Sequence, residues 1–187
     1  MKITRALESR GARVAGARIT VTAGTGPVGM RAAGLFAKAG ADVTITSRKV
    51  DDGARVAQAI MTRFGGQVRC ATMRDHSEAA QVLDQTRPQV LLNAGPAGVL
   101  LVPRAAWAGR EGLLVACDLN VVPPLGIEGI EVADNAATRD GVTTFGAIGV
   151  GGFKMKVHKA CIARLFERND LVLDAETIAE VAQEIGA

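Results

Sequence analysis

The sequence predicts an α/β fold, a Rossmann-like doubly wound parallel sheet with helices on both faces, built as one domain over residues 1–187. Apolar, β-rich runs alternate with amphipathic helical patterns along the chain, which favours helices packed on both faces of one sheet. The expected strands are almost continuously apolar, as strands buried on both faces are. A glycine-rich turn also joins the first expected strand to the next helix, an arrangement typical of this fold class.

The individual elements follow from short apolar runs and from residues that begin or end helices. Strands are expected at residues 17–23, 41–47, 67–73, 89–95, 112–120 and 143–150. Helices are expected at residues 3–11, 28–39, 51–64, 76–86, 104–108, 152–167 and 174–186. The first helix lies in a leading segment, 1–16, and the last in a C-terminal segment, 170–187. Gly40 is expected to end the second helix, and Asp174 to cap the last.

The composition is that of a globular protein and excludes several other classes. Hydrophobic residues make up 48% of the chain and charged residues 22%, which differs from disordered and fibrous compositions. No apolar run reaches the roughly 18 residues that suit a membrane span, and the N-terminus lacks the apolar core of a secretory signal. We therefore expect a cytoplasmic protein without a membrane partner.

The charges and cysteines favour small-molecule binding over nucleic acid or metal. The net charge is +3, but the basic residues are scattered among acidic ones and the chain has no tyrosine, so no nucleic-acid partner is predicted. A mildly basic surface favours anionic small molecules. Cys70, Cys117 and Cys161 lie far apart and are expected to be buried free thiols. With only His76 and His158 beside them, no metal site is predicted.

The first strand runs into the stretch AGTGPVG, in which Gly24, Gly26 and Gly29 form a GxGxxG pattern before a helix. Gly24 would permit the tight turn, Gly26 a close approach of the backbone to a pyrophosphate, and Gly29 close packing of helix on strand. The N-terminus of the helix would add N–H donors and partial positive charge. The alternative is a glycine-rich turn that binds nothing.

The end of the second strand indicates which dinucleotide is bound. An NAD site usually has an acidic residue there to accept from the ribose 2′-hydroxyl, whereas this chain has Ser47, Arg48 and Lys49. A guanidinium and an ammonium would pair with a 2′-phosphate. NADP is therefore the predicted cofactor; the alternative is a solvated charge pair at the start of a helix.

Two further segments are expected at the carboxyl edge of the sheet. Asn93, Ala94 and Gly95 end the fourth strand, which should neighbour the first at the topological switch point, and are expected to line the space for a ribose or nicotinamide. Asn120 follows the fifth strand and is expected near the same crevice, with Asp118 a weaker candidate. The alternative is that both segments are ordinary turns.

Four segments together resemble the NADP-dependent methylene-tetrahydromethanopterin dehydrogenases of methylotrophic bacteria. They are AGTGPVGMR, SRK after the second strand, DLNVVPPLGIEGI, and FGAIGVGGFKMKVHKACIARLFE. They match in order and spacing from about Ala17 to the C-terminus, and the last two are long and unusual. A more distant likeness is to methylene-tetrahydrofolate and shikimate dehydrogenases, which have this kind of cofactor domain.

The resemblance implies a hydride transfer from the methylene group of a reduced, one-carbon-loaded pterin to NADP. The cation left behind is stabilised by nitrogen lone pairs, so no protein base is required, which agrees with the lack of a nucleophile–histidine pair in the sequence. Catalysis would be mostly positioning of the two reactants.

Carried over residue by residue, the resemblance assigns the cofactor and substrate contacts. The pyrophosphate loop matches Gly24, Thr25, Gly26, Pro27 and Val28. Arg48 and Lys49 match the 2′-phosphate grip. A glycine-rich turn beside the nicotinamide matches Gly149, Gly151 and Gly152. Lys154 and Lys156 match a segment near the cleft, with Lys154 favoured as the catalytic residue; the alternative is two solvated lysines. His158 is expected to be partly buried or capping.

The family carries an additional N-terminal substrate domain, whereas this chain begins a short helix before its first strand. We therefore expect the substrate domain to be largely absent, with a homo-oligomer or a separate substrate-domain chain completing the cleft. A non-catalytic NADP-binding module is the alternative function. A carbonyl reductase is a third, disfavoured because it needs a proton donor and the chain has no tyrosine, leaving only Lys154 with Asp118.

Overall fold

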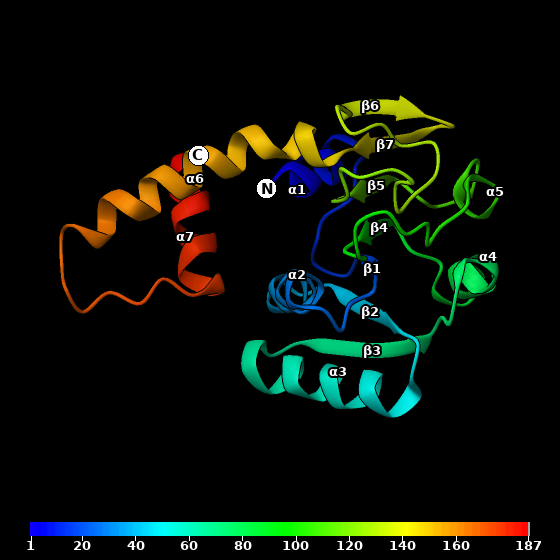
Figure 1. Cartoon of the computed structure of the whole chain (residues 1–187), viewed down its shortest axis with the longest axis horizontal. Coiled ribbons are helices and arrows are strands. Elements are labelled where there is room, and N and C mark those ends of the chain that lie inside the picture. The colour runs from blue at the N-terminus through cyan, green and yellow to red at the C-terminus, as the bar shows by residue number, and fades with distance from the viewer. Residues whose placement is uncertain (187) are drawn as a thin grey trace.

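The computed structural model describes residues 1–186, which form a seven-stranded sheet in the order β3-β2-β1-β4-β5-β7-β6 (Figure 1). All neighbouring strands pair in parallel except β6 and β7. The strands are β1 (Arg18–Thr22), β2 (Asp42–Ser47), β3 (Gln67–Thr72), β4 (Val90–Asn93), β5 (Val115–Asp118), β6 (Asn135–Arg139) and β7 (Val142–Phe145). The predicted Rossmann-like fold is confirmed.

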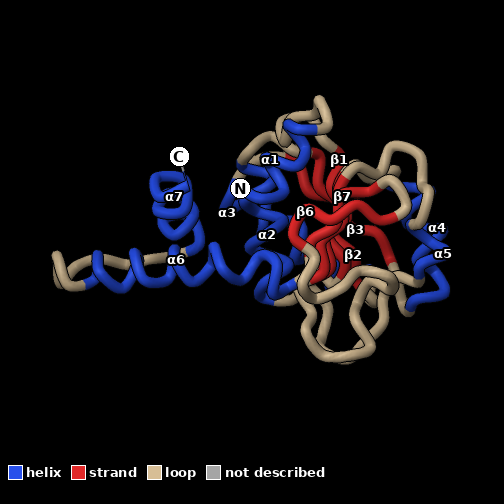
Figure 2. The backbone as a smooth tube through the Cα atoms, turned by 90° about the horizontal axis from the view of Figure 1, so that it is seen from above, coloured by secondary structure: helices blue, strands red, loops and turns tan. Residues whose placement is uncertain are grey.

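Helices cover both faces of the sheet (Figure 2). They are α1 (Lys2–Ser9), α2 (Pro27–Lys38), α3 (Val50–Phe64), the short η1 (His76–Glu78), α4 (Ala79–Thr86), α5 (Arg104–Trp107), α6 (Ala147–Leu165) and α7 (Ala175–Gly186). Helices α1, α2 and α3 lie on one face, and α4 and α5 on the other. None of the helices in residues 1–186 is both long and apolar enough to cross a membrane.

The strand order fixes the position of the crevice in which such folds bind ligands. The chain runs outward from β1 through β2 to β3, then returns across the sheet to place β4 on the other side of β1. This reversal is the topological switch point, and ligands bind beyond the carboxyl ends of the strands there. Thr22, Asn93 and Asp118 end β1, β4 and β5 and are neighbours in the register. Several candidate residues therefore share one edge.

The antiparallel strand β6 was not predicted. It forms a hairpin with β7 through the two residues Asp140 and Gly141, both of which have positive φ, as a type I′ turn requires. The strand sequence, NAATR, is mostly exposed and polar, so it lacks the apolar run from which the other strands were predicted. The Asp-Gly dipeptide was the available signal.

The start of α6 also differs from the prediction. A strand was expected over residues 143–150 and a helix from Gly152, but β7 ends at Phe145 and α6 already begins at Ala147. Gly149, Gly151 and Gly152 therefore lie within a helix, and the expected glycine-rich turn is wrong. Gly146 caps the helix in an extended conformation.

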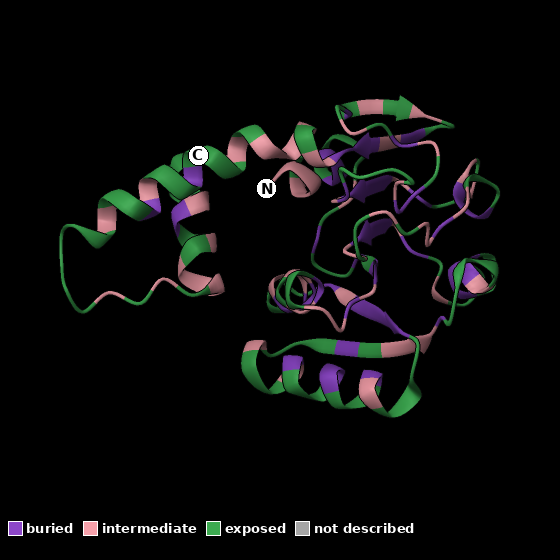
Figure 3. Ribbon diagram, viewed as in Figure 1, coloured by how far each residue is buried: buried purple, intermediate pink, exposed green. Residues whose placement is uncertain are grey.

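The buried side chains form three clusters. The two large ones lie between the sheet and its helices, around Leu7 and Ile45 on one face and around Trp107 and Leu91 on the other. The third is small and joins α6 to α7, which extend from the body as an arm (Figures 1 and 3). The Asp174 carboxylate accepts from the Thr177 N–H at 3.0 Å, which confirms the predicted cap of α7.

Candidate functional site

The loop between β1 and α2 is fixed by backbone contacts that only glycine allows. The Gly24 N–H donates to the Thr46 carbonyl at 3.1 Å. A methyl group on Gly24 would lie 2.5 Å from Ile45 Cβ, and one on Gly29 would lie 2.7 Å from Gly24 Cα. Side chains at Gly24 and Gly29 would thus separate α2 from β1 and β2. Gly29 thus has the close-packing role predicted for it, and Gly24, predicted to permit the tight turn, is packed against Ile45 as well.

Gly26 has a different role, because the space beside it is open. A methyl group there would meet nothing nearer than the Ala23 carbonyl at 3.6 Å. Gly26 caps α2 in an extended conformation, with Pro27 in the first turn. Within residues 1–186, no protein acceptor faces the N–H groups of Thr25, Val28 and Gly29. The loop therefore presents unpaired donors at the positive end of a helix, which suits a phosphate.

Ser47, Arg48 and Lys49 connect β2 to α3 beside this loop. The buried Ser47 hydroxyl donates to the Lys49 carbonyl at 2.8 Å and accepts from the Lys49 N–H at 3.2 Å. The hydroxyl thus holds the turn. The side chains of Arg48 and Lys49 are exposed and form no ion pair with any described residue. Two cations are therefore available to an anionic group near the glycine loop.

A buried polar network joins the ends of β1, β4 and β5. Asn93, which is 0% exposed, accepts from the Thr22 hydroxyl at 2.7 Å and donates to Asp118 at 2.8 Å. Asp118 is 1% exposed and also accepts from the backbone N–H groups of Asn120 and Ile127. Both polar atoms of the Asn93 amide are thus used inside the protein.

The same network holds the loops that follow β4 and β5. The Asn120 amide donates to the Pro96 carbonyl at 2.9 Å, and the Gly95 N–H donates to Asn93 Oδ1 at 3.1 Å. A methyl group on Gly126 would lie 1.8 Å from Asn93 Nδ2. The predicted residues Asn93, Gly95 and Asn120 are therefore brought together, with Ala94 between the first two.

The cysteine beside this polar network is Cys117, which precedes Asp118 in β5. Burial, and to a lesser extent the neighbouring Asp118 charge, raises the pKa of the Cys117 thiol to about 12, so the thiol stays protonated at neutral pH. Cys161 is also buried, whereas Cys70 is only partly buried, contrary to the prediction. Among residues 1–186, no group of three or more His, Cys, Asp or Glu side chains gathers where a metal ion could bind.

The start of α6 is closed by protein rather than open to a ligand. The Gly146 N–H donates to the Asp134 carbonyl, and the N–H groups of Ile148 and Gly149 donate to the Val132 carbonyl. A methyl group on Gly149 would lie 1.7 Å from the Asp134 carbonyl oxygen. Segment 132–134 therefore supplies the acceptors for the first turn of α6. The expected place of Gly149, Gly151 and Gly152 beside the nicotinamide stays a prediction.

Asp134 anchors that segment to the β6–β7 hairpin. Its buried carboxylate accepts from the Arg139 guanidinium at 2.6 and 2.7 Å, from the Thr144 hydroxyl at 2.8 Å and from the Glu131 N–H at 3.2 Å. Burial alone would raise the pKa of Asp134, but these hydrogen bonds outweigh it and hold the pKa below its ordinary value. The contact at the start of α6 is thus rigidly supported.

Two curated proteins of Methylorubrum extorquens AM1 resemble the chain over nearly its whole length. The bifunctional protein MdtA is 39% identical over 179 residues, covering 96% of this chain. An NAD(P)-dependent methylenetetrahydromethanopterin dehydrogenase is 32% identical over 194 residues, covering 98%. The chain is thus similar to a methylenetetrahydromethanopterin dehydrogenase over nearly its whole length. It spans 62% and 63% of the length of these two relatives.

Comparison of structures agrees with the fold. The ligand-free 5-ketofructose reductase of Gluconobacter sp. strain CHM43 aligns over 98% of this chain and 61% of its own, with a TM-score of 0.52 and 18% identity. At that identity, the likeness concerns the fold alone. No family model matches the chain.

Within residues 1–186, no hydrogen bond joins the predicted residues on α6 to the glycine loop or to the polar network. Lys154 is exposed, and its side chain forms no hydrogen bond with another described residue. His158, one turn further along, is also exposed, contrary to the expectation of a partly buried or capping histidine. The role of Lys154 stays a prediction.

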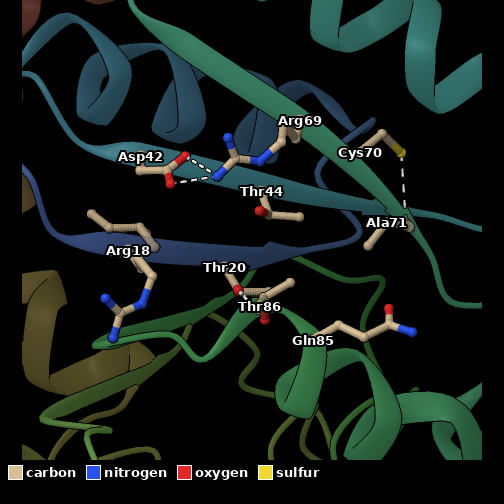
Figure 4. A pocket seen from close by; sticks show the side chains of 10 residues that line it. Arg18, Thr20, Asp42, Thr44, Arg69, Cys70, Ala71, Gln85 and Thr86 are labelled. Carbon is tan, nitrogen blue, oxygen red and sulfur yellow. Dashed lines mark hydrogen bonds and ion pairs between the residues drawn. The ribbon is translucent and has the colours of Figure 1, made fainter.

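A hollow of about 260 Å³ lies over the face of the sheet formed by β1, β2 and β3, away from the crevice (Figure 4). Several of its polar groups already pair with other protein groups: Arg69 binds Asp42, Arg18 donates to the Arg87 carbonyl, and the Thr20 hydroxyl donates to the Thr86 hydroxyl at 3.0 Å. We assign no ligand to it.

Proposed function

We propose that this chain is the NADP-binding part of an oxidoreductase. The reaction is a hydride transfer from methylene-tetrahydromethanopterin, or a related one-carbon-loaded pterin, to the cofactor. The observation that carries the proposal is the open N-terminus of α2 at Gly26, with its unpaired N–H donors. The relationship to an NAD(P)-dependent methylenetetrahydromethanopterin dehydrogenase supports the same cofactor class and reaction.

The residues present fit a dinucleotide. The pyrophosphate would lie over the loop from Gly24 to Gly29. Of the three glycines in this loop, only Gly26 has open space where a side chain would otherwise be, and the phosphates would use this space. Arg48 and Lys49 would pair with the 2′-phosphate, on a turn held by Ser47. The nicotinamide half would lie beyond β4 and β5. When bound, the nicotinamide ring supplies the acceptor for the hydride.

The protein contributes positioning rather than acid–base chemistry. The pterin-derived cation needs no proton removed, and the crevice offers a buried, protonated thiol at Cys117 rather than a base. Holding donor and acceptor in a productive geometry can by itself lower a barrier by several kcal/mol, up to about 10. Lys154 would be the cation that faces the substrate from α6.

The substrate wall would come from outside the matched span. The chain spans 62% and 63% of its relatives' length, and we propose that a substrate-binding part outside these 187 residues, or a second copy, completes the cleft. The second candidate function is a non-catalytic NADP-binding module that requires such a part for turnover.

Cofactor binding and turnover are measured separately. Titration with NADP⁺ and NAD⁺ is expected to show tighter binding of NADP⁺, and Arg48→Ala is expected to weaken NADP⁺ by about tenfold, the loss of one charge-assisted contact. Binding of NAD⁺ by the same variant is the control and should not change. Equal affinity of the unmodified chain for the two nucleotides would refute the proposed 2′-phosphate site.

Turnover is followed as NADPH absorbance with methylene-tetrahydromethanopterin, and with methylene-tetrahydrofolate for comparison. Reduction of NADP⁺ by the chain alone would support the dehydrogenase. Tight binding of NADP⁺ without turnover would support the module that needs another chain.

A further inference from the structure

Asp118 is a buried carboxylate that is satisfied without a cation. Its Oδ1 accepts from Asn93 Nδ2 at 2.8 Å and from the Asn120 N–H at 3.0 Å, and its Oδ2 accepts from the Ile127 N–H at 2.8 Å. No ion pair within residues 1–186 includes it. Burial of a charge is unfavourable unless every oxygen is bonded. A buried carboxylate that is fully hydrogen-bonded to protein groups indicates a structural role that an apolar residue could not fulfil.

The role of Asp118 is to hold the loops that follow β4 and β5 in place. The bond to Ile127 closes the loop that leaves β5, while the bond to Asn93 joins it to the end of β4. From that loop the Asn120 amide reaches Pro96, in the loop that leaves β4. The loops also touch near Gly98, where a methyl group would lie 3.7 Å from the Pro123 carbonyl oxygen. The Asp118 side chain, at the end of β5, thus bonds the end of β4 and both ends of the loop that leaves β5.

These loops lie on one side of the switch point only. Dinucleotides bind across the crevice, with one mononucleotide over each half of the sheet. The glycine loop and Arg48 belong to the β1–β3 half, and the loops held by Asp118 belong to the β4–β5 half. The two loops expose Val99, Val121 and Val122, the second by 55%. In the proposed binding mode, these side chains would lie beside the nicotinamide half.

We infer that Asp118 is a positioning residue that fixes the wall of the nicotinamide half without touching the cofactor. The inference rests on the proposed function. Binding of the two halves of the cofactor then depends on different residues. The adenosine half depends on the glycine loop and Arg48, and the nicotinamide half depends on the Asp118 network.

The test compares two ligands on one variant. Asp118→Asn keeps the shape but places an NH₂ group among three N–H donors, so at least one bond is lost. We expect Kd for 2′,5′-ADP, which carries only the adenosine half, to stay within about twofold, and Kd for NADPH to rise about tenfold. Fluorescence of bound NADPH should also fall, since its ring loses a fixed wall.

Two further variants separate positioning from general damage. Asp134→Asn removes a buried, hydrogen-bonded carboxylate of the β6–β7 hairpin, and is expected to lower stability while the ratio of the two Kd values stays unchanged. Asn120→Ala removes only the bond to Pro96, and is expected to shift the ratio in the same direction by about threefold. Asn120→Ala decides the question if Asp118→Asn does not fold.

The outcomes distinguish this inference from the proposed function. If the unmodified chain binds neither ligand, the proposed function fails. If it binds both, and Asp118→Asn or Asn120→Ala weakens both equally or neither, the function stands and the positioning role is overturned. A selective loss of NADPH affinity supports the role.

Discussion

Two helices, α2 and α6, begin with similar sequences but differ in the hydrogen bonding of their first turns. Each follows a strand, each is capped by a glycine in extended conformation, and each has glycine in its first turn. At α2, the N–H groups of Val28 and Gly29 face no acceptor in residues 1–186. At α6, the corresponding groups of Ile148 and Gly149 donate to the Val132 carbonyl. The first turn of α2 is therefore open to an anion, whereas the first turn of α6 already has a protein acceptor.

The difference shows what a glycine-rich helix start means physically. The unpaired N–H groups of a first turn need acceptors, and a ligand and a neighbouring backbone segment meet that need equally well. In the first turn, glycine is required at both helices because backbone approaches closely: Gly24 approaches Gly29, and the Asp134 carbonyl approaches Gly149. The caps differ, because an added methyl group on Gly146 would collide with the Glu131 carbonyl, whereas Gly26 has open space beside it. The pattern predicts close approach, and tertiary structure decides what approaches.

The largest effect is expected from Gly149→Ala. The added methyl group would lie 1.7 Å from the Asp134 carbonyl oxygen, and because this atom belongs to the backbone, relief requires moving segment 132–134 or α6. We expect the free energy of unfolding, measured by urea denaturation, to fall by about 2–3 kcal/mol. Folded protein should bind NADP⁺ with unchanged Kd. A loss of affinity without a loss of stability would instead place Gly149 at the cofactor, as the sequence suggested.

The fold was predictable because its signals are local. Apolar runs such as VTIT in β2 and helix patterns alternate, and this alternation specifies a parallel sheet with its switch point. The missed strand β6 is polar and exposed, and it is a strand because it pairs with β7. Its Asp140–Gly141 turn was the one local signal. Strand formation by pairing alone cannot be read from a single segment.

The site was predictable to the extent that it depends on residues adjacent in the chain. The glycine loop and the Ser47 turn are such units, and each lies at the expected edge. The polar network depends on Thr22, Asn93 and Asp118, which come from three strands and meet only through the sheet register. Polar residues at the ends of apolar strands marked the positions, but not the bonds between them.

Gly26→Ser tests the open helix start directly. Serine is as good an N-cap as glycine or better, and the nearest atom to its Cβ would be 3.6 Å away, so the free energy of unfolding should change by less than about 0.5 kcal/mol. Its side chain would project into the space assigned to the pyrophosphate. We expect Kd for NADPH to rise at least about tenfold, one lost phosphate contact or more.

The control for this variant is 2′,5′-ADP, whose 5′-phosphate should be displaced while its 2′-phosphate still reaches Arg48. Its affinity is therefore expected to fall less than that of NADPH. Unchanged affinity for both ligands would show that α2 does not hold the pyrophosphate, and the comparison of the two helix starts would lose its functional meaning.

The smallest effect is expected from Gly151→Ala, and its sign is opposite. A methyl group on Gly151 meets no atom within 4 Å, and the residue lies in the second turn of α6. Alanine is favoured over glycine in a helix by about 0.8–1.0 kcal/mol, so the melting temperature and the free energy of unfolding should rise. If Gly151 lies beside the nicotinamide, as predicted, the added methyl group should lower the affinity for NADPH. Because the stretch after the α6 cap is helical and its first turn is bonded to Val132, we expect the variant to be more stable and its Kd for NADPH to stay the same. Titration and thermal unfolding of the one variant therefore decide between the helix seen in the structure and the turn predicted from the sequence.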